Sequence, residues 1–323
     1  MNSRIAKGQL PAVVAAGLAL ILAAPAFGAQ GRFDRTLQVT GPVSLHIQTG
    51  SGDITVRTGN VSRVTVVGRI EANEFFDQRA AEKVRRLEAD PPIQQMGDII
   101  RIGEIRDPEL RRNVSISYDV TTPPETYLDS HTGSGDQRAE GLRRGVKLET
   151  GSGNLTLDDL AGRTELESSS GDIEIRGVQG RVTARTGSGT IHATGIAGSF
   201  SGHTGSGDVT LEQTAAEEVE VETSSGEVRI QGARRALKVT TGSGDVRLEG
   251  QAGDAWDAST GSGDVVLQLS GGFDLLARTE NGSVNVGLPM QDFASSRHET
   301  RGKAGGGGNP VRVTTGSGDI RIE

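Results

Sequence analysis

Short runs of alternating apolar and polar residues fill most of the chain. Segments such as DIEI at 172–175 and DVRL at 245–248 place an apolar side chain at every second position. A second alternating pair follows later in each repeat, as at Val182 and Ala184. Because period-2 alternation is typical of β-strands, each repeat predicts two short strands.

The same glycine turn, TGSGD or a close variant, separates these strands. Its second glycine recurs every 18 or 19 residues from Gly135 to Gly282, and Gly318 follows after 36 residues. The turn glycines are Gly135, Gly153, Gly171, Gly189, Gly207, Gly226, Gly244, Gly263, Gly282 and Gly318. A fixed period of this length indicates stacked structural units. A turn position that is always glycine also predicts φ > 0 there.

The repeat predicts an all-β fold, a single-chain parallel β-solenoid (β-helix) with coils of 18–19 residues. Strands of successive coils would pair about 4.8 Å apart, with inward Val, Ile and Leu forming one core. We expect a right-handed coil, because the spacing lacks the six-residue internal repeat of the left-handed hexapeptide helix. Trp256 is expected in the core. A column of stacked hydroxyl groups is expected from Thr132, Thr150, Thr186, Thr204, Thr223, Thr241, Thr260 and Thr279.

Three segments follow from these patterns: residues 1–28, 29–131 and 132–323. In the first, Arg4 and Lys7 precede an apolar run that breaks at Pro25, which predicts a signal peptide cleaved after Ala26 or Gly28. No second apolar span follows it, so we expect no membrane span after cleavage. The protein would then be exported to the periplasm, the cell surface or the extracellular space.

The middle segment, 29–131, predicts N-terminal strands and one capping helix at about 74–89. Asn73 is the expected N-cap of this helix, and apolar residues recur at helical spacing: Phe76, Ala80, Val84 and Leu87. The last segment, 132–323, is the repeat solenoid. A loop excursion at 289–309 with a flexible glycine run interrupts it before a final coil closes the protein.

The amino-acid composition excludes some kinds of chemistry and some classes of binding partner. The chain has no cysteine, which excludes disulfides, thiol chemistry and cysteine metal sites. Its net charge of -8 argues against nucleic acid as a partner, and only 3% of residues are aromatic, so few rings can stack on sugars.

The residue after each turn glycine forms a column that is largely acidic. Four acids follow one another there and are candidates for Ca²⁺ binding: Asp208, Glu227, Asp245 and Asp264. Alternatively, each carboxylate accepts turn N–H groups and faces solvent, which is the interpretation we prefer. We therefore predict no metal and no cofactor, with a Ca²⁺-stabilised solenoid as an alternative.

Catalytic residues are not evident. His131 and His203 occupy the same coil position four coils apart, near 19 Å from each other at about 4.8 Å per coil, and are expected on the surface. Clustered charges occur only in the 289–309 excursion: Asp292, Arg297, His298, Glu299, Arg301 and Lys303. A β-helix enzyme acting on polysaccharide would need a cleft there. We predict a protein that is not an enzyme, with that enzyme as the alternative.

The signal peptide, the repeated TGSGD[IV]x[IVL] coils, the short helix and the final TGSGDIRI closely resemble the bacterial "putative adhesin" domain family, related to GIN-type adhesin head domains. The resemblance covers roughly residues 32–323. It implies an envelope-associated β-solenoid of unknown function without catalytic residues. The expected function is adhesion, scaffolding or surface sensing, with an envelope protein or a glycan as partner. The oligomeric state is left open.

Overall fold

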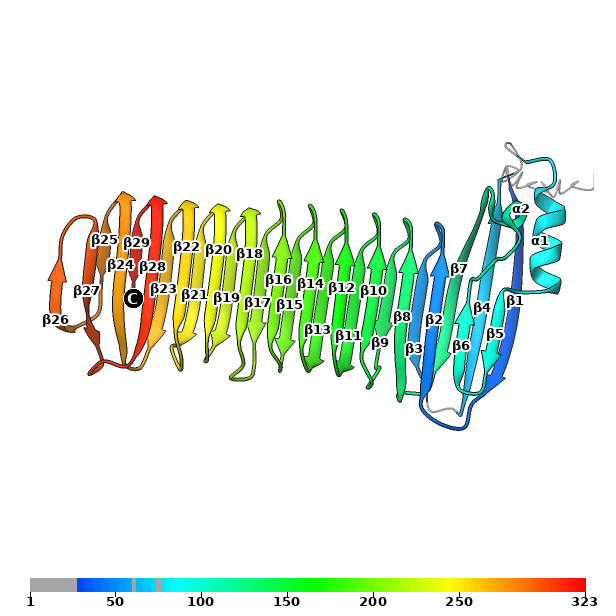
Figure 1. Ribbon diagram of the computed structural model, residues 1–323, viewed down its shortest axis with the longest axis horizontal. Coiled ribbons are helices and arrows are strands. Elements are labelled where there is room, and N and C mark those ends of the chain that lie inside the picture. Colours follow the sequence, from blue (N-terminus) through cyan, green and yellow to red (C-terminus); the bar gives the residue numbers. More distant parts are fainter. Residues whose placement is uncertain (1–27, 60–61, 74–76) are drawn as a thin grey trace, which may run out of the picture.

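Two long β-sheets lie face to face along a rod, and one end of the rod carries helices (Figure 1). The computed structural model describes residues 28–59, 62–73 and 77–323. The expected signal peptide and Phe76 lie outside the described residues. Among the described residues, no helix is long and apolar enough to cross a membrane.

Each sheet is ordered along the rod. In spatial order the 15-stranded sheet contains β26 (Met290–Ser295), β27 (Glu299–Ala304), β24 (Phe273–Asn281), β28 (Asn309–Ser317), β22 (Trp256–Ser262), β20 (Leu237–Ser243), β18 (Val219–Ser225), β16 (Phe200–Thr204), β14 (Val182–Thr186), β12 (Thr164–Ser168), β10 (Val146–Thr150), β8 (Thr126–Thr132), β2 (Val43–Thr49), β6 (Ile99–Ile102) and β5 (Ile93–Met96). The 14-stranded sheet contains β1 (Ala29–Gln38), β4 (Arg63–Ala72), β7 (Val114–Thr122), β3 (Ile54–Thr58), β9 (Gln137–Glu140), β11 (Leu155–Ala161), β13 (Ile173–Gln179), β15 (Ile191–Ile196), β17 (Val209–Gln213), β19 (Val228–Ala233), β21 (Val246–Gln251), β23 (Val265–Ser270), β29 (Ile320–Ile322) and β25 (Val284–Val286).

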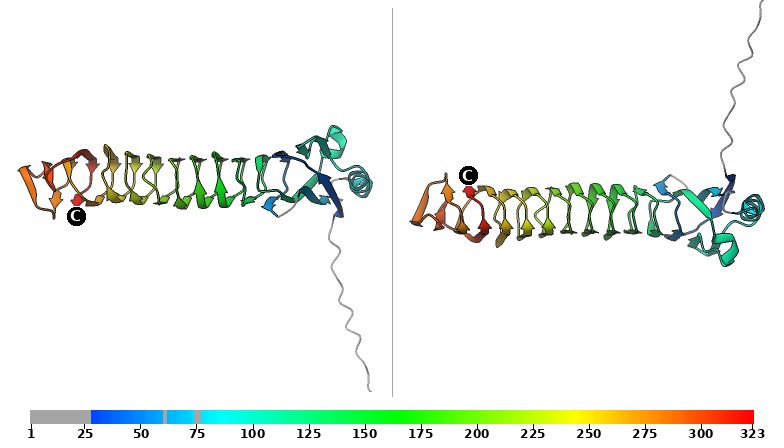
Figure 2. Two further views of the ribbon diagram at one scale, coloured as in Figure 1. Left: turned by 90° about the horizontal axis from the view of Figure 1, so that it is seen from below. Right: turned by 90° about the horizontal axis from the view of Figure 1, so that it is seen from above.

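The predicted parallel β-solenoid is confirmed. Each coil gives one strand to each sheet, and Figure 2 shows the flattened coils edge-on. Parallel register places equivalent residues side by side, as at Ile173 and Ile191. The inward residues of both sheets form one continuous core that includes Trp256, whose indole N–H donates to the Arg235 carbonyl at 2.7 Å. The right-handed sense of the coil stays a prediction.

The predicted threonine column is buried and links each coil to the one before it. The Thr150 hydroxyl donates to the carbonyl oxygen of Gly135 at 3.1 Å and accepts the N–H of Gly153 at 3.0 Å. Ser168 makes the same two bonds one coil later, to Gly153 and Gly171. From Thr132 to Thr204, a buried hydroxyl therefore satisfies two backbone groups at each corner, which would otherwise cost free energy. In the later coils the N–H of the turn glycine donates to a backbone carbonyl instead, as Gly226 does to Ser243.

Most turn positions require glycine because the backbone of the preceding coil lies too close to leave room for a Cβ atom. Backbone conformation is the lesser reason. Positive φ, which the sequence predicted for all of them, occurs at Gly244, Gly263 and Gly318 and at none of the other seven turn glycines. A Cβ on Gly153 would lie 1.8 Å from the carbonyl oxygen of Gly135 in the preceding coil. Stacked corners pack backbone against backbone, so the prediction of φ > 0 was wrong for most of them.

The N-terminal end is covered by non-repeating structure. The coil of β2 and β3 stacks directly on that of β8 and β9, and residues 63–122 between them form the cap. Helix α1 (Ala80–Ala89) packs on β1, where a Cβ on Gly31 would lie 2.4 Å from Val84. A second helix, α2 (Pro108–Arg111), was not predicted and begins where Asp107 accepts the N–H of Glu109.

The predicted start of the long helix was wrong. Asn73 is not its N-cap, because the Asn73 N–H donates to the carbonyl of Asn113 and continues the β4–β7 pairing. The helix begins at Ala80, after a turn in which the Asp77 side chain accepts the N–H of Arg79 at 2.9 Å.

The C-terminal end departs from the sequence order. The expected loop at 289–309 is a β-hairpin of β26 and β27, which pairs antiparallel with β24. Strand β28 then returns to lie between β22 and β24, and β29 lies between β23 and β25. The final coil therefore does not close the rod but fills a space one coil before its end.

The glycine run at 305–308 makes this return possible. It crosses the start of β24 so closely that a Cβ on Gly308 would lie 2.4 Å from the Gly272 carbonyl oxygen. The Gly308 N–H also donates to the Asp274 carboxylate at 3.1 Å. The run was expected to be a flexible loop, but here it is a packed crossover.

Candidate functional site

The acidic column at the corners is a ladder of hydrogen bonds between coils. The Asp136 carboxylate accepts the N–H of Asn154 at 2.8 Å, and the Asn154 side-chain oxygen accepts the N–H of Asp172 at 2.9 Å. Each acceptor thus reaches one coil forward. At this position an amide oxygen accepts the backbone N–H of the next coil as a carboxylate does. The role of these side chains is therefore to satisfy backbone N–H groups at the corners.

Three of the four Ca²⁺ candidates accept hydrogen bonds in the same ladder, whereas the Glu227 carboxylate bonds to Arg229. Asp208 accepts the N–H of Glu227 at 2.7 Å, and Asp245 accepts that of Asp264 at 2.8 Å. Asp264 accepts the N–H of Asp319, because the inserted coil follows it in space. Within the described part of the chain, no group of three or more His, Asp or Glu side chains is placed to hold a metal ion.

We expect Asp245→Asn to leave the thermal stability nearly unchanged, because the amide keeps the acceptor. Asp245→Ala removes it and should lower the free energy of unfolding by about 1 kcal/mol. Thermal denaturation of both variants, with Ca²⁺ and with a chelator, measures this. Stabilisation by Ca²⁺ that both variants lose would instead show a metal column.

Two ion pairs form within the 289–309 excursion on the exposed hairpin, and Arg278 of β24 joins one of them. The Lys303 ammonium lies 2.8 Å from the Asp292 carboxylate and holds its pKa below the usual range. Arg278, with Arg301, lowers the pKa of Glu299 in the same way. A glycosidase needs an acid whose pKa is raised, so neither carboxyl has the property of a general acid.

The two histidines in one column stay apart. His131 and His203 lie on β8 and β16, with three strands between them, and each lies beside a glutamate of the next coil. The His131 Nδ1–Glu149 Oε2 and His203 Nδ1–Glu222 Oε2 distances are both 3.6 Å.

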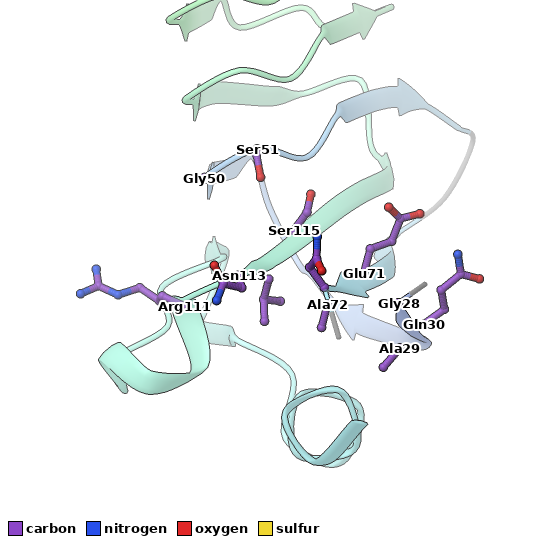
Figure 3. A pocket seen from close by; sticks show the side chains of 12 residues that line it. Gly28, Ala29, Gln30, Gly50, Ser51, Glu71, Ala72, Arg111, Asn113 and Ser115 are labelled. Atoms are coloured by element: carbon purple, nitrogen blue, oxygen red, sulfur yellow. The ribbon is translucent and has the colours of Figure 1, made fainter. Parts of the chain in front are cut away.

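A pocket of about 580 Å³ opens beside the N-terminal cap (Figure 3). Polar side chains from separate segments line it, among them Gln30, Glu71 and Arg111. In Figure 3 these three side chains point in different directions and do not converge on one point. The pocket also begins at Gly28, where the described chain begins, so we do not select it as the functional site.

Two joined hollows on the outward face of the 15-stranded sheet form a groove along the rod. One, of about 520 Å³, crosses β14, β16, β18, β20 and β22, and the other, of about 220 Å³, crosses β10, β12 and β14. They share Thr183 and Arg185. The groove is defined by the outward residues Lys147, Glu149, Arg163, Glu165, Glu167, Arg181, Thr183, Arg185, Ser199, Ser201, Glu218, Glu220, Ala236, Lys238, Ala255 and Asp257.

The groove exists because short side chains occupy successive outward positions. Thr183 and Ser201 are register partners at its centre, between Glu165 on one side and Glu220 on the other. The long side chains beside them rise above this uncharged floor. Since alternation sets which residues face outward, the local sequence of each strand decides the depth of the groove.

The charges along the groove are mixed and partly neutralise one another. Lys238 lies 2.9 Å from Glu220, which raises the pKa of the lysine. Lys147 lies 2.7 Å from Glu149 and lowers the pKa of that carboxyl. No single sign of charge dominates, so the groove favours neither a polyanion nor a polycation.

Our prediction from sequence identified none of the groove residues. The signal was present, because Thr183, Ser199 and Ser201 occupy outward positions that the alternation already assigned. Small side chains give no chemical signal in a sequence, and the hollow that they form is visible only when the strands are placed in register.

Comparisons with known proteins agree with this architecture. A family model described as Toastrack DUF4097 matches residues 35–196 and again 181–323. Among solved structures the chain is similar to a "putative lipid binding protein" from Parabacteroides distasonis, at 15% identity over 91% of this chain and 97% of that chain, with a TM-score of 0.44. It is also similar to a "putative cell adhesion protein" from Clostridium sporogenes (12% identity, 91% and 99% covered, TM-score 0.22). A "putative adhesin" from Bacteroides fragilis is matched at 12% identity, with 90% and 97% covered and a TM-score of 0.31.

These structural likenesses carry no statement about the function of this chain, because the identities and TM-scores are low. No curated protein matches the chain. The family match, in contrast, spans nearly all of the described residues and confirms the predicted resemblance. The chain belongs to the Toastrack (DUF4097) family.

Proposed function

We propose that this protein is an exported envelope protein that binds an extended partner along the groove without cleaving it. The observation that carries the proposal is that the hollows join along the axis of the rod, across strands β10 to β22. A groove in this direction suits a long polymer and leaves a compact ligand with few contacts.

An uncharged, extended glycan is the partner that fits best. Strand spacing offers a new row of side chains about every 4.8 Å, and an extended β-1,4-linked glycan advances by roughly one such spacing per sugar. Hydroxyl groups of Thr183, Ser199 and Ser201 and the charged rims can hydrogen-bond to sugar hydroxyls. Because few aromatic rings are present, recognition would depend on hydrogen bonds and repetition.

Filling the groove should abolish binding. We expect Ser201→Trp, at the floor, to weaken binding to the best ligand of a cell-wall glycan array by at least tenfold, about 1.4 kcal/mol. Thr210→Trp is the matched control, because Thr210 is half-buried and faces outward on β17 in the opposite sheet of the same coil. Binding should be measured with product analysis by mass spectrometry.

Equal losses in both variants would contradict the groove as the binding surface. Shortened sugar products would contradict binding without cleavage. Glycan arrays without any binding, followed by capture of an envelope protein that Ser201→Trp abolishes, would replace the glycan by a protein partner.

A further inference from the structure

Outside the groove, three side chains at the N-terminal end of the 15-stranded sheet lie in a row: a hydrogen-bonded Ser–His pair and an aspartate beside the other nitrogen of the histidine. Ser44 and His46 are two residues apart on β2 and both face outward, and the Ser44 Oγ–His46 Nε2 distance is 3.2 Å. On the other side of the ring, the His46 Nδ1–Asp129 Oδ2 distance is 3.4 Å. The acid comes from β8, the register partner of β2.

This is the order of groups that activates a serine. A carboxylate at Nδ1 holds the proton on that nitrogen, which leaves Nε2 free to accept the proton of the serine hydroxyl. Such a series is recognised by its geometry and roles and not by position in the chain. Here the register of β2 with β8 places Asp129 beside His46, and the alternation of β2 places Ser44 and His46 on the same face.

An exposed apolar patch lies beside the serine. The register partner of Ser44 on β6 is Ile99, and that of Ile99 on β5 is Met96. Ile99 is 42% exposed and Met96 is 73% exposed, and they are two of the three large hydrophobic side chains exposed in the described chain. The apolar part of a substrate can rest on them while its carbonyl group lies over Ser44.

We propose that Ser44, His46 and Asp129 form a nucleophilic site that accepts acyl groups from esters with an apolar acyl chain. Ser44 Oγ attacks the ester carbonyl carbon, and its proton passes to His46 Nε2. The bond to the leaving alcohol breaks as the alcohol takes this proton. Water then attacks the acyl-serine, its proton returns through Nε2 to Ser44 Oγ, and the products are a carboxylic acid and an alcohol.

The site is open to water. The side chains of His46 and Asp129 are 38% and 39% exposed, so the electrostatic support from a low dielectric is weak. We therefore expect slow turnover and a readily detected acyl-serine. Asp129 on β8 is the register partner of the groove residue Lys147 on β10, whereas Ser44 and His46 lie one strand further away, on β2. Substitutions at Ser44 therefore test the reaction without changing a residue of the groove or its neighbours in register.

The chain contains a matched control. Ser201 and His203 have the same spacing on β16, and His203 Nδ1 lies 3.6 Å from Glu222 Oε2. The described structure has no hydrogen bond between Ser201 and His203, and the register partners of Ser201 are Thr183 and Glu220, which are polar. Ser201 should therefore be unreactive.

The test is labelling of the purified protein with a fluorescent fluorophosphonate, followed by peptide mapping, together with hydrolysis of p-nitrophenyl butyrate. We expect label on Ser44 and none on Ser201, and loss of both label and hydrolysis in Ser44→Ala. His46→Ala should slow labelling by about 10²- to 10⁴-fold. Asp129→Asn should slow it as well, and all three variants should retain the parent melting temperature.

Absence of label, label that persists in Ser44→Ala, or label confined to lysine or histidine would overturn the proposal. Equal labelling of Ser44 and Ser201 would also overturn it, because the hydrogen bond to His46 would then have no effect.

Discussion

Gly153→Ala is expected to lower the free energy of unfolding by at least about 3 kcal/mol, at the upper end of the range for overpacked sites. The added Cβ would lie 1.8 Å from the carbonyl oxygen of Gly135. The clash is with the backbone of the neighbouring coil, so no side-chain rotation can relieve it. Either the coils separate locally or the corner shifts and breaks the bonds of Thr150. Urea denaturation followed by circular dichroism measures the loss.

A substitution in the same turn provides the control. Gly151→Ser should cost clearly less than Gly153→Ala, although a Cβ on Gly151 would also come close to the preceding coil, 2.3 Å from the Gly133 carbonyl oxygen. Ser169 and Ser224 occupy the equivalent position in other coils, so the backbone at this place can shift to admit a side chain. If both variants were equally stable, inter-coil contact could not be the reason for the constant second glycine.

Deletion of residues 309–323 should unfold the end of the rod while the rest of the stack remains. Without β28 and β29, strand β24 loses its parallel partner, and β22 and β23 lose the coil that covers them. Repeat units are stabilised by their neighbours, so residues 273–304 have no coil left to stack on. Hydrogen exchange should show roughly 100-fold less protection there, about 2.7 kcal/mol, and little change in β8 to β16.

Addition of a synthetic 309–323 peptide is the control for this deletion. The peptide should restore protection in β24, because the space between β22 and β24 has the shape of one coil. Protection in residues 273–304 that survives the deletion without peptide would contradict the inserted arrangement.

Regular features were predictable from the sequence because they depend on neighbouring coils of the same kind. Alternation identified the inward residues, and the constant spacing identified the stack and its corners. The role of the turn glycines was misjudged, since a contact between coils and a positive φ both require glycine. Only the three-dimensional structure shows which of these two causes applies at a given glycine. At Gly153 the cause is the contact between coils, because its φ is not positive.

Features that depend on long-range register could not be predicted. Ser44 and His46 are visible in the sequence as a pair two residues apart. Asp129 lies beside them only because β2 pairs directly with β8, although the chain between these two strands includes the cap. The inserted final coil was missed for the same reason. Its sequence fits any position in the stack equally well, so the repeat pattern alone does not place it before β24.

The inserted coil also determines how such a rod could change its length during evolution. Duplication of a coil between β8 and β22 adds one more layer with the same corners on both sides and leaves both ends intact. A coil appended after β29 has no free strand beside it, because β28 and β29 already have neighbours on both sides. Internal duplication is thus the route to a longer rod that leaves the pairing of the last strands unchanged.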